Sequence, residues 1–510
     1  MLLTVLILLP LVGAIATALY SFAPSKQEAH YKWIALIFTL VMFALSLGLL
    51  SGGAYGDANF HFVTNVEWVQ AIKARYHIGI DGISLWLVIL TTLLMPLAVL
   101  CSWTAVQEKQ AAFYAMLLIL ESAMIGVFVS LDLLLFYLFF EASLVPMLFL
   151  IGVWGSKNRI YAATKFFIYT AVGSLLMLVG IIALYAKFGT WDYTELLKVA
   201  NQLPLNMEYW LFGAFALAFF IKVPMFPFHT WLPEAHTEAP TAGSVILAGV
   251  LLKMGTYGLL RFNLPLFPNA AKDFAPYIIV LCIIGIIYGA LVAMVQPDMK
   301  RLVAYSSVSH MGFVVLGLFS FTEQGMQGAL YQMLNHGVST GALFLFVGMI
   351  YERRHTRLIG QFGGLCHRMP VFSTLLVMAS MASIGLPLLN GFVGEFLILL
   401  GTRLTPAISH PGWATALAGL GVILSAVYML WMLQRVIFGA ITHEENATLQ
   451  DLNKREIGLV LPLMALMLIM GLVPGIFLSK TRASVMAAGV GVIQQTASPK
   501  GVVAKQQTPH

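Results

Sequence analysis

Blocks of apolar residues recur from one end of this chain to the other, separated by short polar stretches. Each block is about 20 residues long, the length at which a helix crosses the roughly 30 Å hydrocarbon core of a bilayer. The pattern therefore predicts an all-α polytopic membrane protein with about 14 transmembrane helices. The predicted spans cover residues 1–20, 31–50, 80–104, 112–130, 132–154, 162–186, 208–229, 241–262, 275–296, 301–320, 326–351, 370–402, 412–439 and 457–479.

Composition supports this fold and excludes a water-soluble one. Only 10% of the residues are charged and 60% are hydrophobic, whereas soluble domains carry roughly 25% charged residues. The net charge of +6 is spread over short loops, so it indicates membrane topology and not a nucleic-acid partner. The three cysteines are far apart, and no CxxC, GxGxxG or P-loop motif occurs. Sequence therefore offers no grounds for a metal, iron–sulfur or nucleotide site.

The positive charges also predict orientation. An even number of spans places both termini on one side of the membrane. Loops reached after the first span hold thirteen Lys or Arg residues, Lys300 among them, and the opposite loops hold seven, Arg261 among them. The positive-inside rule then makes the first side cytoplasmic and both termini external. The polar tail after Ser479 is expected to be frayed.

Proline interrupts two of the spans. Pro224 and Pro227 break the seventh, and Pro387 breaks the twelfth. Proline frees backbone carbonyls that lipid cannot satisfy, so such breaks belong inside a bundle, beside water or polar groups. Because the breaks are five spans apart, we expect two copies of a five-helix unit in inverted orientation. The resulting segments are 1–110 (spans 1–3), 111–262 (spans 4–8), 263–440 (spans 9–13) and 441–510 (last span and tail).

Four charged residues lie inside apolar spans: Glu141, Lys222, Lys253 and Glu395. A charge at the centre of a span costs at least about 2.5–3.5 kcal/mol. Any one of them could be a structural ion pair or a snorkelling side chain. Together they form a candidate chain of proton-binding sites, because burial and a nearby carboxylate shift the proton affinity of a lysine in opposite directions. A Glu141–Lys222 pair would hold the proton on the lysine when close and release it when apart.

Other titratable residues extend this chain. His310 and His336 can bind a proton near neutral pH and pass it between their ring nitrogens; the alternative is a neutral histidine hydrogen-bonded between helices. Glu121 is mid-span and could join the pathway. Asp132 and Lys165 lie nearer the ends of spans, where capping or interfacial roles fit equally well.

A further group of titratable residues follows the break in the seventh span. It consists of His229, Glu234, His236 and Glu238. Their spacing resembles that of metal ligands. We expect this loop to face solvent and its prolines to form a turn, which disfavours a metal site.

Three stretches resemble the proton-pumping signature of the antiporter-like subunits of respiratory complex I. They are KVPMFPFHTWLPEAH at 222–236, APTAGSVILAGVLLK at 239–253 and DMKRLVAYSSVSHMG at 298–312. That superfamily also contains Mrp-type cation/proton antiporters and membrane-bound hydrogenases. The stretch 136–146 around Glu141 is similar to the subunit M family, called subunit 4 in mitochondria. Glu395 is the sharper marker, since related subunits are expected to carry lysine there.

The resemblance implies a fold and roles for individual residues. It implies 14 helices with inverted repeats at spans 4–8 and 9–13. The implied roles are Glu141 and Lys222 as a coupled pair, Lys253 as the central relay, Glu395 as the terminal proton site, and His310 and His336 as connecting relays. Glu121 is outside the family motif, so its role stays open.

The resemblance also implies partners. The chain would be a proton-translocating subunit of NADH-quinone oxidoreductase without a redox site of its own. FMN, iron–sulfur clusters and quinone would be bound by partner subunits, and the antiporter-like subunits L and N would be its neighbours in the lipid bilayer. Three rival hypotheses remain: an Mrp-type antiporter subunit, the membrane subunit of a hydrogenase, and a passive scaffold whose buried charges only hold helices together.

Overall fold

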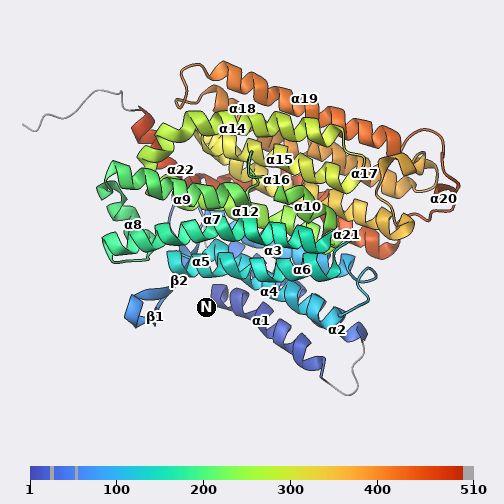
Figure 1. Cartoon of the computed structure of the whole chain (residues 1–510), viewed down its shortest axis with the longest axis horizontal. Coiled ribbons are helices and arrows are strands. Elements are labelled where there is room, and N and C mark those ends of the chain that lie inside the picture. The colour runs from blue at the N-terminus through green and yellow to red at the C-terminus, as the bar shows by residue number, and fades with distance from the viewer. Residues whose placement is uncertain (23–27, 52–54, 498–510) are drawn as a thin grey trace, which may run out of the picture.

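The computed structural model describes residues 1–22, 28–51 and 55–497 as a single helical bundle (Figure 1). The first spans are α1 (Leu2–Tyr20), α2 (Glu28–Leu47), α3 (Gly82–Cys101), α4 (Gln110–Val129), α5 (Leu133–Ala142) with α6 (Leu144–Trp154), and α7 (Arg159–Phe188). Next come α8 (Tyr193–Val199), α9 (Leu205–Lys222), α10 (Trp231–Glu238), α11 (Thr241–Ile246), α12 (Leu252–Gly258) and α13 (Leu264–Leu266). The rest are α14 (Pro268–Met294), α15 (Met299–Leu318), α16 (Glu323–Arg354), α17 (Pro370–Ser383), α18 (Asn390–Arg403), α19 (Pro411–Val436), α20 (Glu444–Ala447), α21 (Lys454–Leu472) and α22 (Gly475–Ala497).

These helices confirm the predicted spans. Within the described ranges, thirteen helices are long and apolar enough to cross a membrane. Twelve of them coincide with predicted spans, and the thirteenth is α22. The remaining two predicted spans are those broken by proline, which form α9 with α10 and α17 with α18. Twelve continuous spans and two broken ones account for the expected 14.

The centre of the bundle is α16. It packs against α15, α18, α11 and α21, and its apolar window is fully buried. Its polar residues Gln332, Asn335 and His336 are buried too. Lipid cannot satisfy such groups, so they must find partners on the neighbouring helices.

Both proline breaks form turns inside the bundle. The first separates Lys222, the last residue of α9, from α10. The second joins α17 to α18 through Gly385, whose φ of 76° favours glycine. A Cβ at Gly385 would lie 2.5 Å from Glu395 Oε2. The second break therefore places its turn directly against the Glu395 carboxylate.

The eighth span is also irregular, which the sequence did not predict. Two π-helical segments, Leu247–Leu251 and Leu259–Asn263, flank α12. A π-helical turn changes the backbone hydrogen-bond register and is often found at functional sites. Lys253 follows the first segment and Arg261 lies in the second.

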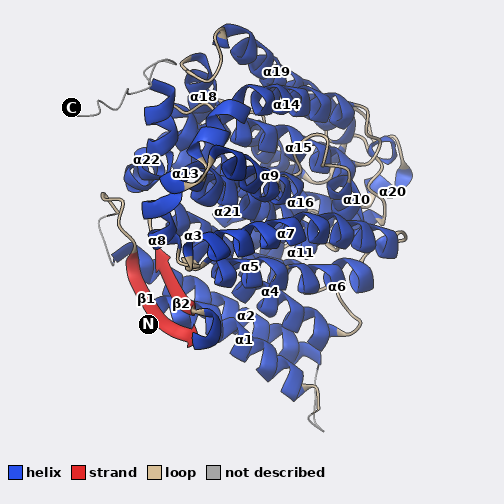
Figure 2. Ribbon diagram, turned by 60° about the vertical axis from the view of Figure 1, so that its left-hand side comes forward, coloured by secondary structure: helices blue, strands red, loops and turns tan. Residues whose placement is uncertain are grey.

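A two-stranded sheet caps one end of the bundle, which we call the hairpin end (Figure 2). The antiparallel strands are β1 (His61–Val69) and β2 (Ala74–Ile80). Two aspartates attach them to the bundle: Asp132 Oδ2 accepts a hydrogen bond from the Arg75 amide at 3.1 Å, and Asp192 Oδ2 lies 2.6 Å from His77 Nδ1. The same aspartates cap α5 and α8. The hairpin and α8 lie at the end opposite α20, which we call the α20 end (Figure 1).

The tail prediction was wrong up to residue 497, because 475–497 form the helix α22. Ser484 Oγ accepts a hydrogen bond from the Gly82 amide at 3.0 Å, and Arg482 Nε lies 2.6 Å from Glu323 Oε1. Both partners are the first residues of spanning helices, α3 and α16. α22 therefore lies across the hairpin end and does not extend through the bundle. Residues 498–510 lie outside the described residues.

Candidate functional site

Lys222 ends α9 at the first break and is 1% exposed. In the described part of the chain, no hydrogen-bond partner contacts its Nζ. Nζ lies instead over the rings of Phe140, at 5.0 Å from the centroid, and Phe166, at 5.7 Å. Aromatic faces attract an ammonium group but accept no proton from it. Among the described residues, Lys222 is thus a buried lysine without a hydrogen-bonded counter-ion.

The predicted Glu141–Lys222 pair is an electrostatic one and not a contact pair. Glu141 lies in the last turn of α5, is half-buried, and interacts with Ser174 and, through charge, with Lys222. No ion pair within 4.0 Å joins the two among the described residues. The structure thus shows Glu141 and Lys222 interacting through charge without a direct ion pair.

Lys253 and His336 are brought together from two different halves of the chain. Lys253 is fully buried on α12, and its Nζ lies 2.6 Å from His336 Nδ1 on α16. Its Nζ also donates a hydrogen bond to the Ala248 carbonyl, in the first π-helical segment. The ammonium donates and a neutral imidazole nitrogen accepts, so this contact can carry a proton.

The row continues from His336 to Glu395. The rings of His336 and His310 lie 5.9 Å apart between centroids. His310 Nδ1 lies 3.3 Å from Glu395 Oε1, and both residues are buried. Ser383, at the second break, lies 3.4 Å from His310 Nε2. Four of the predicted site residues therefore lie in one row: Lys253, His336, His310 and Glu395.

Buried amides hold the end of this row in place. Gln332 Nε2 donates to Glu395 Oε1 at 3.3 Å, and Asn335 Nδ2 donates to Gln332 Oε1 at 2.9 Å. Gln332 and Asn335 come from α16, the helix that also carries His336. In the described structure, Glu395 Oε2 has no hydrogen-bond partner. One carboxylate oxygen is thus oriented by the protein and the other is left available to a proton.

Lys222 and Lys253 lie on helices in direct contact. A Cβ at Gly255 would lie 2.8 Å from the Phe219 carbonyl and 3.0 Å from the Val223 amide, so the backbones of α12 and α9 touch beside both lysines. The glycine makes this close approach possible.

His236 is a candidate relay that sequence reasoning missed. It was expected in a solvent-facing loop, but α10 buries it completely, with neither ring nitrogen bonded in the described structure. Its ring stacks on Phe344 at 4.6 Å, and it lies within electrostatic range of Lys253 and Lys300. The signal available in the sequence was its place beside a helix break, as for Lys222.

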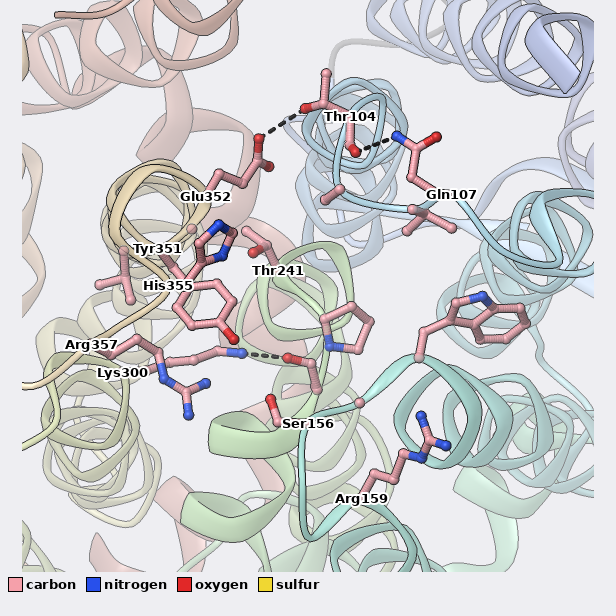
Figure 3. A pocket seen from close by; sticks show the side chains of 18 of the residues that line it. Thr104, Gln107, Ser156, Arg159, Thr241, Lys300, Tyr351, Glu352, His355 and Arg357 are labelled. Carbon is pink, nitrogen blue, oxygen red and sulfur yellow. Dashed lines mark hydrogen bonds between the residues drawn. The ribbon is translucent and has the colours of Figure 1, made fainter. Parts of the chain in front are cut away.

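A cavity of about 700 Å³ lies at the α20 end, and Ala239, Thr241 and Lys300 are among the residues that line it (Figure 3). Its rim includes the exposed residues Gln107, Arg159 and His355. Lys300 is among the lining residues that are buried, and its Nζ donates to the carbonyl of Ala239, the residue that caps α10. Lys300 was counted as a loop charge, so burial corrects that expectation.

The three remaining candidates lie apart from the row. Glu121 is fully buried on α4, and neither carboxylate oxygen has a partner among the described residues. Asp132 caps α5, accepting hydrogen bonds from the Leu134 and Leu135 amides at 2.9 and 3.0 Å. Lys165 is half-buried, with its ammonium 5.6 Å from the Tyr161 ring centroid.

The loop group that resembled metal ligands is divided among other partners. Glu234 pairs with Arg301 at 3.3 Å, and Glu238 accepts a hydrogen bond from the Asn158 amide at 2.9 Å. Across the described residues, no three His, Cys, Asp or Glu side chains are gathered as metal ligands.

A polytopic bundle with a buried row of lysine, histidine and glutamate defines a proton-translocating membrane protein. Residues 130–408 match the family model described as NADH:quinone oxidoreductase/Mrp antiporter, transmembrane. NADH-quinone oxidoreductase subunit M of Rhodobacter capsulatus is 47% identical over 93% of this chain and 94% of its own. The chain belongs to the NADH:quinone oxidoreductase/Mrp antiporter family.

Solved structures agree. A chain of respiratory complex I from Thermus thermophilus superposes with a TM-score of 0.86 and 32% identity, over 96% of this chain and all of that one. A chain of the Mrp complex from Dietzia sp. gives a TM-score of 0.83 at 18% identity, over 98% of this chain and all of that one, which shows a common fold alone.

Proposed function

We propose that this chain, a proton-translocating membrane subunit of NADH-quinone oxidoreductase, moves protons along its buried row from Lys222 to Glu395. The observation that carries the proposal is the 2.6 Å contact between Lys253 and His336. It joins the two predicted repeats, 111–262 and 263–440, at the middle of the bundle. A proton relay between helices needs groups within hydrogen-bond reach, directly or through one water, and this contact meets that requirement.

Protons would enter at the α20 end. The cavity there connects exposed residues to buried Lys300, which is bonded to the cap of the short helix that carries His236. His236 lies within electrostatic range of Lys253. This route supplies the central lysine from the side predicted to be cytoplasmic, with both termini on the external side of a bacterial inner membrane.

Glu141 would link the row to a neighbouring subunit. Beside it, Leu138, Val145 and Phe149 form an exposed apolar stripe, each more than 40% exposed. A protein neighbour on this face, which we assign to one of the antiporter-like subunits L and N, would place its own charges near Glu141. A changed charge there alters the Glu141–Lys222 interaction, which is the differential electrostatics that coupling requires.

The redox chemistry would take place in other subunits. We assign NADH, FMN, the iron–sulfur clusters and quinone to partner chains. Quinone reduction would reach Lys222 only as a change in electrostatic potential. Membrane lipid would surround the remaining rim helices.

An Mrp-type antiporter subunit, a hydrogenase membrane subunit and a passive scaffold are the alternatives. The 47% identity to an NADH-quinone oxidoreductase subunit supports the proposed function over the Mrp-type antiporter subunit and the hydrogenase membrane subunit. The passive scaffold is disfavoured because burying an unpaired polar group such as Lys222 Nζ costs folding free energy. A scaffold without a proton-transfer role would have no benefit to offset that cost.

The deciding experiment replaces Lys222 or Glu141 by alanine in the assembled complex. Proton pumping and NADH:quinone turnover should both collapse while the other subunits stay bound. Lys187→Met, an exposed lysine on α7, is the matched control and should behave as wild type. Wild-type pumping in both alanine variants would contradict the proposal.

A further inference from the structure

Arg261 is a buried cation that the proton row does not use. The sequence placed it in an external loop, but it is 3% exposed in the second π-helical segment. Its Nη2 lies 2.5 Å from Asp81 Oδ1 and 3.4 Å from Ser84 Oγ. The guanidinium lies over the rings of Phe60, at 5.2 Å, and Tyr257, at 5.5 Å.

Arg261 stands on the same span as the central lysine. Lys253, Tyr257 and Arg261 follow one another at intervals of four residues on this span, and the Arg261 guanidinium, in the second π-helical segment, lies over the Tyr257 ring. Tyr257 donates to the Phe128 carbonyl at 3.0 Å. Polar groups thus run from Lys253 towards the hairpin end, away from the Lys253–His336 contact.

We call Lys253, Tyr257 and Arg261 the second polar file. It ends at the hairpin end, beneath other elements of the fold. Asp81 caps α3, accepting hydrogen bonds from the Ile83 and Ser84 amides, both at 3.1 Å. The next residue, Gly82, donates to Ser484 of α22. Figure 1 shows α22, α8 and the hairpin together at this end. Between Lys253 and the external solvent, the file therefore contains one fixed ion pair.

A proton pump needs such a barrier. If Lys253 exchanged protons with the external side directly, the proton gradient would discharge through the first repeat without passing Glu395. Arginine keeps its proton at any physiological pH, so it cannot act as a relay. A positioned arginine excludes protons and cations from the polar pores of other membrane proteins by its fixed charge.

We propose that the Arg261–Asp81 pair is an electrostatic seal that closes the external side of Lys253. Protons then leave Lys253 only through His336, His310 and Glu395. Asp81 holds the guanidinium in the file, and the two aromatic rings exclude water around it. The proposal rests on Lys253 being the central relay of the proposed function.

The test uses the whole complex reconstituted in proteoliposomes. The variant is Arg261→Met with Asp81→Asn, which removes both charges together and leaves no unpaired buried ion; Asn still caps α3. Passive proton leak without substrate is measured, then NADH:quinone turnover with and without an uncoupler. We expect a leak several-fold above wild type, loss of stimulation by uncoupler, and turnover with uncoupler within about twofold of wild type.

Two further variants separate a seal from a structural ion pair. Adding Lys253→Met should abolish the extra leak, since a seal guards that lysine, whereas a leak caused by loose packing would persist and overturn the proposal. Arg261→Lys, which retains a cation, should keep most of the barrier. A wild-type leak in the assembled double variant would also overturn it.

Failure of the seal is distinguishable from failure of the proposed function. Lys253→Met alone tests the relay: pumping that survives it contradicts the relay whatever Arg261 does. If Arg261→Met with Asp81→Asn does not assemble, Arg261→Gln with Asp81→Asn gives the same readouts with a hydrogen-bonding side chain in place of the apolar one.

Discussion

Lys253 Nζ and His336 Nδ1 lie 2.6 Å apart, although 83 residues separate them in the chain. The ammonium can donate only if Nδ1 is unprotonated, so His336 then carries its proton on Nε2. Nε2 has no partner among the described residues, and the His336 ring is the neighbour of His310. A proton passed from Lys253 to Nδ1 can therefore leave from Nε2 towards the second half of the row.

Lys253→Met should stop pumping and reduce NADH:quinone turnover by at least about tenfold, since a relay position without a titratable group contributes no proton transfer. Methionine preserves most of the buried volume, so assembly should be retained. Pumping measured in proteoliposomes, with subunit content determined in parallel, checks this. Full pumping in the variant would favour the passive scaffold.

His310→Gln should uncouple Lys253 from Glu395. Glutamine can hydrogen-bond but cannot bind a proton at neutral pH, so pumping should fall by about tenfold or more. Ser383→Ala removes only the 3.4 Å contact to His310 Nε2 and should cost no more than about twofold, since it affects orientation alone. Equal losses in the two variants would argue that His310 is structural.

Gly385→Ala should displace the Glu395 carboxylate. The positive φ is strained for alanine, and its Cβ would lie 2.5 Å from Glu395 Oε2. We expect reduced pumping and a loss of stability of about 1–2 kcal/mol. Gly419→Ala is the matched control: Gly419 is in α19 with nothing within 4 Å of an added Cβ, so it should be neutral or stabilise the helix by about 0.5–1 kcal/mol. Thermal unfolding and pumping assays check both.

Lys300→Met should slow proton uptake. Lys300 lies between the cavity and the cap of α10, and removing it takes a proton-binding group from the proposed entry. Pumping and turnover should fall together, by about tenfold. Arg301→Met is the control, because Arg301 is partly exposed and pairs with Glu234 instead; its rate should be close to wild type. An unchanged rate in Lys300→Met would mean that protons enter elsewhere.

Asp192→Asn should loosen the hairpin. Burial by itself raises the pKa of Asp192, but hydrogen bonds from His77 and Thr194 hold that pKa below its usual range. A carboxylate with a lowered pKa stabilises the fold above its ordinary pKa, and this contribution is lost as pH falls through the lowered value. Losing the charged hydrogen bond should cost about 1–3 kcal/mol at neutral pH, while asparagine still caps α8.

Limited proteolysis of the 61–80 hairpin measures this loss. Asp57→Asn changes the exposed Asp57–His61 pair, which lies 3.0 Å apart, and should leave the protection unchanged. Wild-type protection in Asp192→Asn at neutral pH would show that the Asp192–His77 contact does not anchor the strands.

Sequence alone determined the spans, the two breaks and the residues of the row. These are local properties: a block of about 20 apolar residues is a membrane helix wherever it packs, the closely spaced Pro224 and Pro227 and the Gly385–Pro387 stretch interrupt their helices, and a charge inside an apolar block is expected to be withdrawn from lipid. For that reason Glu141, Lys222, Lys253 and Glu395 could be named before any contact was known.

Tertiary structure alone decided which of these groups meet. Lys253 touches His336 and His310 faces Glu395, whereas Glu141 stays apart from Lys222. Such distances depend on how helices from distant parts of the chain pack, and no local pattern contains that information.

The same reason explains the residues that the sequence misplaced. His236, Lys300 and Arg261 were expected in loops because each lies near the end of an apolar block. Short helices, π-helical turns and neighbouring elements bury all three. Sequence does not show whether a charged residue at the end of a span is buried or faces solvent, since its burial depends on which other elements pack over it. Only the folded bundle distinguishes a topology signal from a proposed relay or a proposed seal.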